Sequence, residues 1–260
     1  MFRHKAILQA CLFILIGGFL FDAESYAQSR ELANPPQKRF EISFGGGWGL
    51  YSMKNINRHY IDDFAKEFDI FNDHIDNGPN LFGEIGYFVS PKVSVSFGIN
   101  YLWGGMDHKS YQVRTDEQGN VLDSSLAYTK TSLTTTLVAP ELKIRYYFPI
   151  KKMDLFVSGG TTWCFGKSAL KAKFNLPEGF VLEEYRFAAQ GVGFMASTGV
   201  SYNLNKTISF DTEIGYRVFG TDDLKDKNDK IWIVDATGRP YKMNLDFSGP
   251  FVLGRLSIRL

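Results

Sequence analysis

His108 and Ser110, with Lys109 between them, are the residues whose types and spacing come closest to a catalytic pair in this sequence. A hydroxyl becomes a useful nucleophile when a nearby imidazole takes its proton, and an acidic group commonly orients that imidazole. The chemistry open to such a pair is acyl transfer. Two further histidines, His59 and His74, have no nucleophile at an informative spacing.

Acidic residues gather around those two histidines: Asp62, Asp63, Asp69, Asp73 and Asp76. Carboxylate oxygens suit Ca²⁺, but the spacing does not fit an EF-hand loop. The sequence therefore favours a solvated acidic loop over a metal site. No phosphate-binding loop, zinc-ligand spacing or nucleotide fingerprint appears, so we expect neither a metal nor a cofactor.

The elements that must position the charged side chains are β-strands. In the segment Thr134–Phe148, three charged residues alternate with three apolar ones: Glu141, Leu142, Lys143, Ile144, Arg145 and Tyr146. Successive strand residues point to opposite faces of a sheet, so this strand has a charged face and an apolar face. Pro140 cannot donate a ladder hydrogen bond, and we expect a local irregularity there.

Similar alternation recurs about eight times along the chain. It predicts strands near Arg39–Tyr51, Leu81–Val89, Lys92–Trp103, Thr134–Phe148, Asp154–Phe165, Gly191–Leu204, Thr207–Phe219 and Val252–Leu260. The connections alternate between short turns and long loops, the long ones being Ser52–Asn80, Gly104–Lys130, Gly166–Gln190 and Gly220–Asn244. This alternation is typical of transmembrane barrels. We therefore predict an all-β fold, an eight-stranded antiparallel transmembrane β-barrel.

The long loops carry structure signals of their own. In the first, Tyr60, Ile61, Phe64 and Phe68 recur at helical spacing, which predicts a short amphipathic helix at the outer interface or across the barrel mouth. The other three contain hairpin turn signals at Glu117–Asn120, Pro177–Gly179 and Ala236–Gly238. These signals predict strand pairs that project beyond the membrane.

The N-terminus has the pattern of an export signal. Basic residues precede an apolar core at Ala10–Phe21, and Ser25-Tyr26-Ala27 fits the small-x-small cleavage rule. We expect a signal peptide at residues 1–27, a periplasmic N-terminal segment at 28–38 and the barrel at 39–260. Cys11 leaves with the signal, so Cys164 has no partner for an internal disulfide.

Two features decide which face of the barrel meets lipid. The apolar faces carry aromatic residues at both ends, as membrane barrels do: Trp48, Trp103, Trp163 and Tyr216 toward the long loops, and Phe40, Phe148 and Tyr202 toward the short turns. The opposite face carries charges of both signs: Glu41, Glu84, Glu141, Lys143, Arg145, Asp211, Glu213, Arg217 and Arg255. In an eight-stranded lumen such side chains can pair. A soluble barrel with an apolar interior is the alternative.

The strand "APELKIRYYF", its short turn and the following "LFVSGGTTW" resemble the fourth and fifth strands of small outer-membrane barrels of the OmpA, OmpX and OmpW kind. The C-terminal "VLGRLSIRL" is similar to the barrel-assembly signal of such proteins, although it ends in Leu260 where many end in Phe. The resemblance implies a Gram-negative outer membrane, with both termini periplasmic and the long loops extracellular. It also implies contact with outer-membrane lipid, lipopolysaccharide and the barrel-assembly machinery, but no particular ligand.

His108 and Ser110 can now be compared with lipid A deacylases, which are barrels that pair His and Ser in the same H-x-S spacing. In this sequence Tyr111 follows the pair, where that family has Asn. Counting alternate strand positions from the outward-facing Trp103 puts His108 on the lumen side. We therefore expect a non-enzymatic barrel that is structural or binds through its loops. Passage of a small apolar solute, a lipid-modifying activity and a place in a larger envelope complex stay open. The net charge of +1 gives no basic field for nucleic acid.

Overall fold

The computed structural model describes residues 39–62, 74–111, 114–115, 121–123, 128–150, 153–176, 179–234 and 240–260. The expected signal peptide and N-terminal segment therefore lie outside the described residues. Within the described ranges, no helix is long and apolar enough to cross a bilayer.

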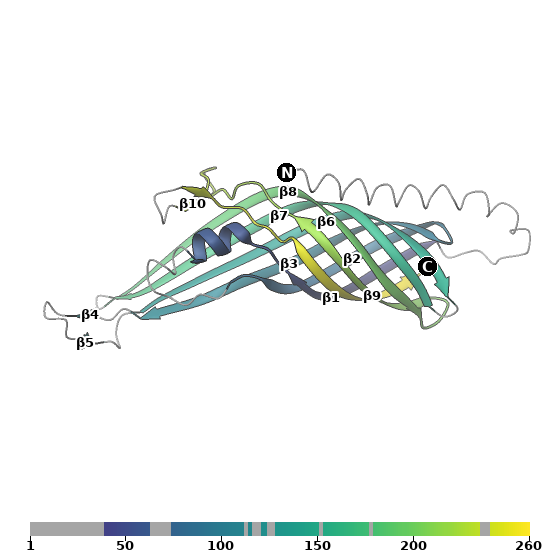
Figure 1. Cartoon of the computed structure of the whole chain (residues 1–260), viewed down its shortest axis with the longest axis horizontal. Coiled ribbons are helices and arrows are strands. Elements are labelled where there is room, and N and C mark those ends of the chain that lie inside the picture. The colour runs from purple at the N-terminus through teal and green to yellow at the C-terminus, as the bar shows by residue number, and fades with distance from the viewer. Residues whose placement is uncertain are drawn as a thin grey trace, which may run out of the picture. The chain divides into compact units, whose positions relative to one another are not determined.

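Eight antiparallel strands form a closed barrel, and Figure 1 shows them tilted across its wall. Around the ring the order is β1 (Phe40–Leu50), β12 (Gly249–Arg259), β9 (Ile208–Phe219), β8 (Gly179–Asn203), β7 (Met153–Leu176), β6 (Tyr128–Ile150), β3 (Val93–Tyr111) and β2 (Asn77–Ser90). The ring closes between the first and last strands, where Ile42 pairs with Ile258. The predicted eight-stranded fold is confirmed.

The two faces of the barrel wall divide as the alternation predicts. On β6 the side chain of Leu142 is 47% exposed, whereas its neighbour Lys143 is 1% exposed. Between the aromatic belts the exposed positions of the barrel strands are largely apolar, and the buried set holds the charges. An apolar outer surface around a polar interior is the arrangement that a lipid environment requires.

The barrel wall is much taller on one side than on the other. Strands β3, β6, β7 and β8 are far longer than β1, β2, β9 and β12, and β6 pairs with β7 from Ile150 and Met153 out to Tyr128 and Asn175. The predicted strand ends at Trp103 and Phe165 are therefore wrong, because both residues lie within continuous strands. After Trp103 and Phe165 the sequence no longer alternates between charged and apolar residues, which is the pattern from which the strands were predicted.

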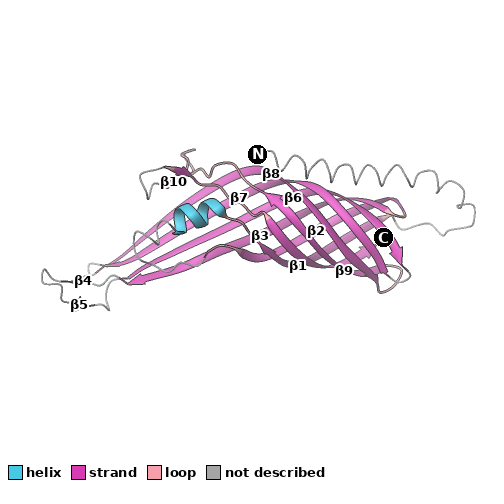
Figure 2. Ribbon diagram, in the orientation of Figure 1, coloured by secondary structure: helices cyan, strands magenta, loops and turns pink. Residues whose placement is uncertain are grey.

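Small elements occupy the long connections. Two of the predicted turns are flanked by paired strands. One pair is β4 (Arg114–Thr115) with β5 (Val121–Asp123), and the other is β10 (Ile233–Val234) with β11 (Tyr241–Lys242). The third predicted hairpin joins β7 to β8 directly, with Leu176 opposite Gly179. A short π-type helix, η1 (Ile56–Asp62), begins earlier than the predicted helical pattern, whose Phe64 and Phe68 lie outside the described residues. Figure 2 shows this helix in cyan beside the strands.

Pro140 causes the expected irregularity without shifting the strand register. Val138 pairs with Phe165 and Glu141 with Thr162, while the positions between them are not paired across β6 and β7. The hydroxyl of Thr162 donates a hydrogen bond to the carbonyl oxygen of Pro140, 2.7 Å away. The side-chain bond links the two strands where proline has no N–H to donate.

Candidate functional site: the charged lumen and the mouth cluster

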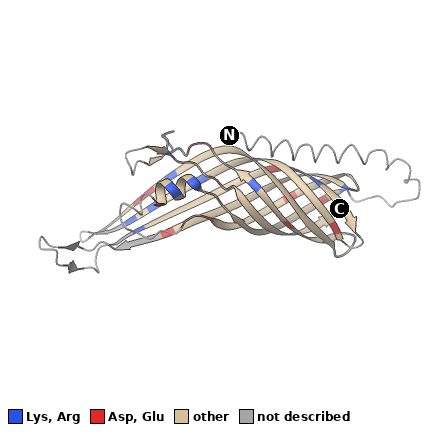
Figure 3. Ribbon diagram, viewed as in Figure 1, with Lys and Arg blue, Asp and Glu red and all other residues tan. Residues whose placement is uncertain are grey.

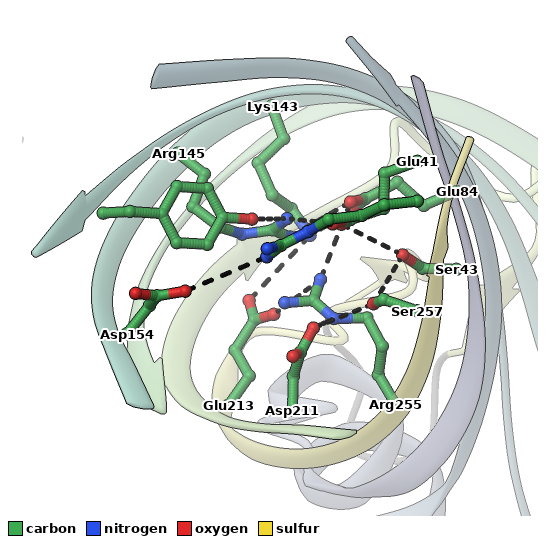
Figure 4. A network of polar contacts seen from close by, with 12 residues as sticks. Glu41, Ser43, Glu84, Lys143, Arg145, Asp154, Asp211, Glu213, Arg255 and Ser257 are labelled. Atoms are coloured by element: carbon green, nitrogen blue, oxygen red, sulfur yellow. Dashed lines mark hydrogen bonds and ion pairs between the residues drawn. The ribbon is translucent and has the colours of Figure 1, made fainter. Parts of the chain in front are cut away.

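The nine charged residues predicted to face the lumen all lie on the inner face of the wall, and all are buried: Glu41, Glu84, Glu141, Lys143, Arg145, Asp211, Glu213, Arg217 and Arg255. Except for Arg217, they meet near one level of the barrel, which we call the charge layer. Figure 4 shows members of this layer converging from different sides of the wall: Glu41, Glu84, Lys143, Arg145, Asp211, Glu213 and Arg255.

Glu84 stands at the centre of the charge layer. Its carboxylate oxygens lie 3.1 Å from Nη2 of Arg145, 3.2 Å from Nζ of Lys143 and 3.6 Å from Nη1 of Arg255. Three cations from two strands thus share one acid that belongs to a third strand. Removing that acid would leave Arg145 without its nearest carboxylate and would take one of their partners from Lys143 and Arg255.

A second acidic side faces the same cations from β9. Nε of Arg255 donates to Asp211 over 2.6 Å, and its Nη1 lies 3.5 Å from Glu213. Serine hydroxyls supply further donors to these carboxylates: Ser257 to Asp211 at 2.9 Å and Ser197 to Glu213 at 2.6 Å. Lys143 also reaches Glu141, 2.9 Å away on its own strand. Each member of the charge layer therefore has at least one opposite charge beside it.

Small residues make room for these long side chains. Lys143 has Ser96 and Gly160 opposite it on the neighbouring strands. Arg145 likewise stands between Ser94 and Ser158. Alternation of small and large residues is how narrow barrels fill their interior. The charge layer is thus a packed core rather than a lining around open space.

Arg259 belongs to the same network, and our sequence analysis did not include it. Its Nε donates to Glu41 at 3.0 Å, and its Nη2 lies 4.0 Å from Asp154. Arg259 is two residues beyond Ser257 and four beyond Arg255, so it lies on the same face of β12. The alternation of the strand could therefore have predicted that it faces the lumen. Toward the short-turn end the network borders an aromatic cluster of Phe88, Tyr147 and Phe156.

Arg217 lies on the other side of the charge layer, toward the long loops. It forms no ion pair with a carboxylate in the described part of the chain. Instead its guanidinium carbon lies 4.9 Å from the ring centre of Phe251 and 5.7 Å from that of Tyr51, which are cation–π distances. A Cβ at Gly49 would collide with Nη2 of Arg217, so this close approach requires glycine.

Beyond Arg217 the interior is apolar. Residues from two connections pack against the inner face of the tall wall and form what we call the mouth cluster. The first connection supplies Tyr51, Met53, Ile56, Ile61 and Ile75; the last supplies Leu224, Met243, Leu245 and Phe247; the strands supply Leu102, Met106, Leu133, Leu137, Ala189 and Phe219. The helix η1 therefore lies over the mouth of the barrel, one of the two sites that its amphipathic pattern allowed.

The two connections also bind each other. The backbone N–H of Ser52 donates to the carbonyl of Ser248 at 2.9 Å, and that of Met53 donates to Asp246 at 2.9 Å. Tyr60 packs edge-on against Trp232, with ring centres 5.3 Å apart, and burial raises the pKa of its phenol to about 12. These contacts make the mouth cluster one packed unit.

Replacing Asn57 with Ala is expected to loosen the first connection. The Asn57 amide donates to the carbonyl of Ile75 at 3.1 Å and accepts from its backbone N–H at 3.0 Å, and all of these groups are buried. Leaving them unpaired costs about 1–3 kcal/mol. We expect faster amide exchange across residues 51–62 in Asn57→Ala, with unchanged exchange in the barrel strands. An exchange pattern identical to that of the wild type would contradict this role for Asn57.

The predicted aromatic belts lie on the outer surface. Toward the long-loop end are Trp48, Trp163 and Tyr216, all exposed, with the half-buried Trp103. Toward the short-turn end are Phe40, Phe148 and Tyr202, all exposed. The indole N–H of Trp48 donates to the Asn77 side chain at 3.2 Å, leaving its apolar ring turned outward.

Among the described residues, the side chains considered for chemistry do not form a catalytic site. His108 and Ser110 pair through their backbones with Thr131 and Thr129, and their side chains lie outside the described residues. In the acidic loop, His74 lies 2.6 Å from Asp62, whereas Asp63, Asp69 and Asp73 lie outside the described residues. No group of acidic, His or Cys side chains within the described ranges has a metal-binding arrangement.

A closed eight-stranded barrel with an apolar outer face and a charged interior defines an outer-membrane β-barrel protein. The family described as "Outer membrane protein beta-barrel domain" matches residues 19–234, and the chain belongs to that family. The outer membrane is therefore its location. No curated protein matches the sequence.

Solved structures of outer-membrane proteins are similar to this chain at low identity. A major outer membrane protein from Thermus thermophilus is 10% identical, with 85% of this chain and 99% of that one covered and a TM-score of 0.42. Outer membrane protein W of E. coli is 14% identical, with 87% and 100% covered and a TM-score of 0.34. Neisserial surface protein A is 10% identical, with 85% and 97% covered and a TM-score of 0.38. Such likeness concerns the fold alone, and a fold does not fix function.

Proposed function

We propose that this protein is a closed, non-enzymatic outer-membrane barrel that acts through the surface it presents beyond the membrane. In this proposal the lumen is a structural core and not a solute path. The tall strands β3, β6, β7 and β8, together with the mouth cluster, carry the structural or binding role. The observation that supports it most is the presence of two different packed layers across one narrow lumen.

The charge layer supports closure because its members hold one another. Glu84 contacts three cations, and the aromatic cluster of Phe88, Tyr147 and Phe156 lies beneath them. An ion that crossed this level would have to separate buried pairs and leave each partner uncompensated, which is costly in a low-dielectric interior. A stable water-filled pore is therefore not expected.

The mouth cluster supports closure by a different mechanism. Its side chains Met53, Ile56, Leu245 and Phe247 are fully buried against the tall wall. A small apolar solute would enter only if the two connections lifted away together, exposing this surface to water. We therefore place ligand binding, if it occurs, on the outside of the extension rather than in the lumen.

We further propose the orientation of the barrel, with the tall extension outside the cell and both termini in the periplasm. Short turns on the periplasmic side and long connections on the outside are the rule for such barrels. Export through a signal peptide at residues 1–27, followed by insertion by the barrel-assembly machinery, belongs to the same proposal. A further envelope protein as partner would dock on the extension.

Single cysteines at Lys227 and Asn205 test this orientation. Lys227 lies in the last long connection and Asn205 in the short turn between β8 and β9, and both are exposed. On intact cells an impermeant maleimide is expected to label Lys227→Cys, and to label Asn205→Cys only after the outer membrane is opened. The native Cys164 is buried and supplies little background. Labelling of Asn205→Cys alone on intact cells would reverse the assignment.

A further inference from the structure

Arg217 of β9 lacks the kind of partner that the cations of the charge layer have. Its side chain is buried, and no carboxylate of the described residues forms an ion pair with it. The rings of Tyr51, Phe219 and Phe251 lie 5.7, 5.7 and 4.9 Å from its guanidinium carbon. These cation–π contacts stabilise the charge. They leave the buried Nε and Nη2 atoms without a hydrogen-bond acceptor.

A second buried polar side chain near Arg217 is also unpaired. Asn80 of β2 is 1% exposed, and neither Nδ2 nor Oδ1 of its amide has a hydrogen-bond partner among the described residues. Both side chains line one interior space, which we call the Arg217 cavity. Its lining residues are Asn80, Asn100, Met195, Arg217, Phe219, Phe251 and Leu253. Buried polar groups are nearly always paired, with protein, water or an ion, so two unpaired ones in one cavity indicate an occupant.

The charge of that occupant follows from its neighbours. Figure 3 shows acidic (red) and basic (blue) segments together in the half of the barrel that holds the C-terminus. In the charge layer each cation has a carboxylate beside it, as Arg255 has Asp211 at 2.6 Å. Glu141 has one oxygen without a hydrogen-bond partner, but its ion pair is with Lys143 and not with Arg217. No described side chain in direct contact therefore supplies the negative charge that a buried guanidinium requires.

The dimensions of the Arg217 cavity restrict the occupant to a small ion. About 180 Å³ of space among the lining side chains is not filled by atoms, and it is divided into gaps narrower than a water molecule. An occupant therefore requires a side chain to shift, and the guanidinium can do so because it ends a long chain of rotatable bonds. A water molecule there would pair with Asn80 and leave the charge of Arg217 uncompensated. An anion supplies both the acceptor and the opposite charge.

We propose that the Arg217 cavity holds one monovalent anion of halide size, bound by the guanidinium of Arg217 and the Nδ2 group of Asn80. The charge layer lies on one side of the cavity and the mouth cluster on the other. The anion is therefore enclosed when the barrel folds and is not taken up as a solute. It is an internal structural ligand and has no part in the surface role proposed above.

Refolding with two different anions tests the inference. The purified barrel is unfolded in urea and refolded into lipid vesicles with sodium bromide or with sodium gluconate at equal ionic strength, since gluconate is too large for the cavity. The test variant is Arg217→Met, which removes the charge, and Arg217→Lys retains it. The matched control is Lys206→Met, an exposed position in the short turn that changes the net charge equally. Asn80→Leu removes the amide and leaves the charge of Arg217 in place.

We expect bromide to stabilise the wild type and Lys206→Met relative to gluconate. At ten times its dissociation constant, an anion bound only by the folded protein shifts the unfolding equilibrium about tenfold. Arg217→Met should lose this response, and it also reports the general effect of the two salts on the barrel. Arg217→Lys and Asn80→Leu should each keep a weaker response. An equal response to bromide in Arg217→Met and the wild type would overturn the proposal.

Anomalous diffraction from crystals of the bromide-refolded protein locates the ion itself. We expect one bromide peak inside the barrel, within hydrogen-bonding distance of the Arg217 guanidinium. Density without an anomalous signal at that place would show that water fills the cavity, and the anion assignment would be wrong. A cavity without density, or a bromide peak only on the outer surface, would equally contradict it.

Discussion

Glu84→Gln is expected to lower the free energy of unfolding by about 3–5 kcal/mol, the largest loss of stability from any single charge change in the barrel. The substitution keeps the size of the side chain, removes its charge and replaces one acceptor oxygen with an NH2 donor. Lys143, Arg145 and Arg255 would then share the remaining acids Glu41, Glu141, Asp211 and Glu213. All three cations are buried, so bulk water does not reach them.

Denaturant unfolding in lipid vesicles measures the effect, with Asp223→Asn as the control. Asp223 forms an ion pair with Lys242 at 3.1 Å, but both side chains are partly exposed to solvent. Such surface pairs contribute about 0–1 kcal/mol, so the control should unfold close to the wild type. Equal midpoints for Glu84→Gln and Asp223→Asn would show that the charge layer does not hold the barrel together.

Leu142→Arg is expected to hinder membrane assembly strongly. Leu142 lies on the lipid side of β6, between the belts marked by Phe148 and Trp103. An arginine near the bilayer midplane of a barrel costs about 2–4 kcal/mol, and about 0–1 kcal/mol near the interface. The level of heat-modifiable, membrane-inserted protein reports the result.

Leu204→Arg is the matched control, since Leu204 is equally apolar and exposed but lies in a short turn at the barrel end. We expect it to assemble nearly normally. Should Leu142→Arg also assemble at the wild-type level, the outer face of β6 would not contact lipid, and a soluble barrel would regain support.

The strands and their facing could be predicted because lipid and lumen impose opposite demands on neighbouring residues. Glu141, Lys143 and Arg145 carry that signal on β6. The signal disappears beyond the belt, where the outward positions of the strand meet water and carry charged side chains, although the ladder of hydrogen bonds continues. For this reason the continuation of β7 from Phe165 to Leu176 was not predicted as strand.

The mouth cluster could be predicted only in part. The alternation of Met243, Leu245 and Phe247 with polar residues is visible in the sequence, and so is the apolar side of η1. The contact between these two segments joins residues near position 50 to residues near position 250. No local sequence pattern encodes a contact over that separation. The pairings across the lumen were unpredictable for a related reason, because they depend on the stagger of the closed ring.

Planar-bilayer recording of the unmutated protein tests the closed lumen most directly. The two packed layers predict no large, stable conductance steps at any salt concentration. Brief, small events would reflect movement of the two connections and would leave the charge layer in place. Large, long-lived steps whose size rises in proportion to salt concentration would contradict the account, because they require a continuous water-filled path past Glu84 and its three cations.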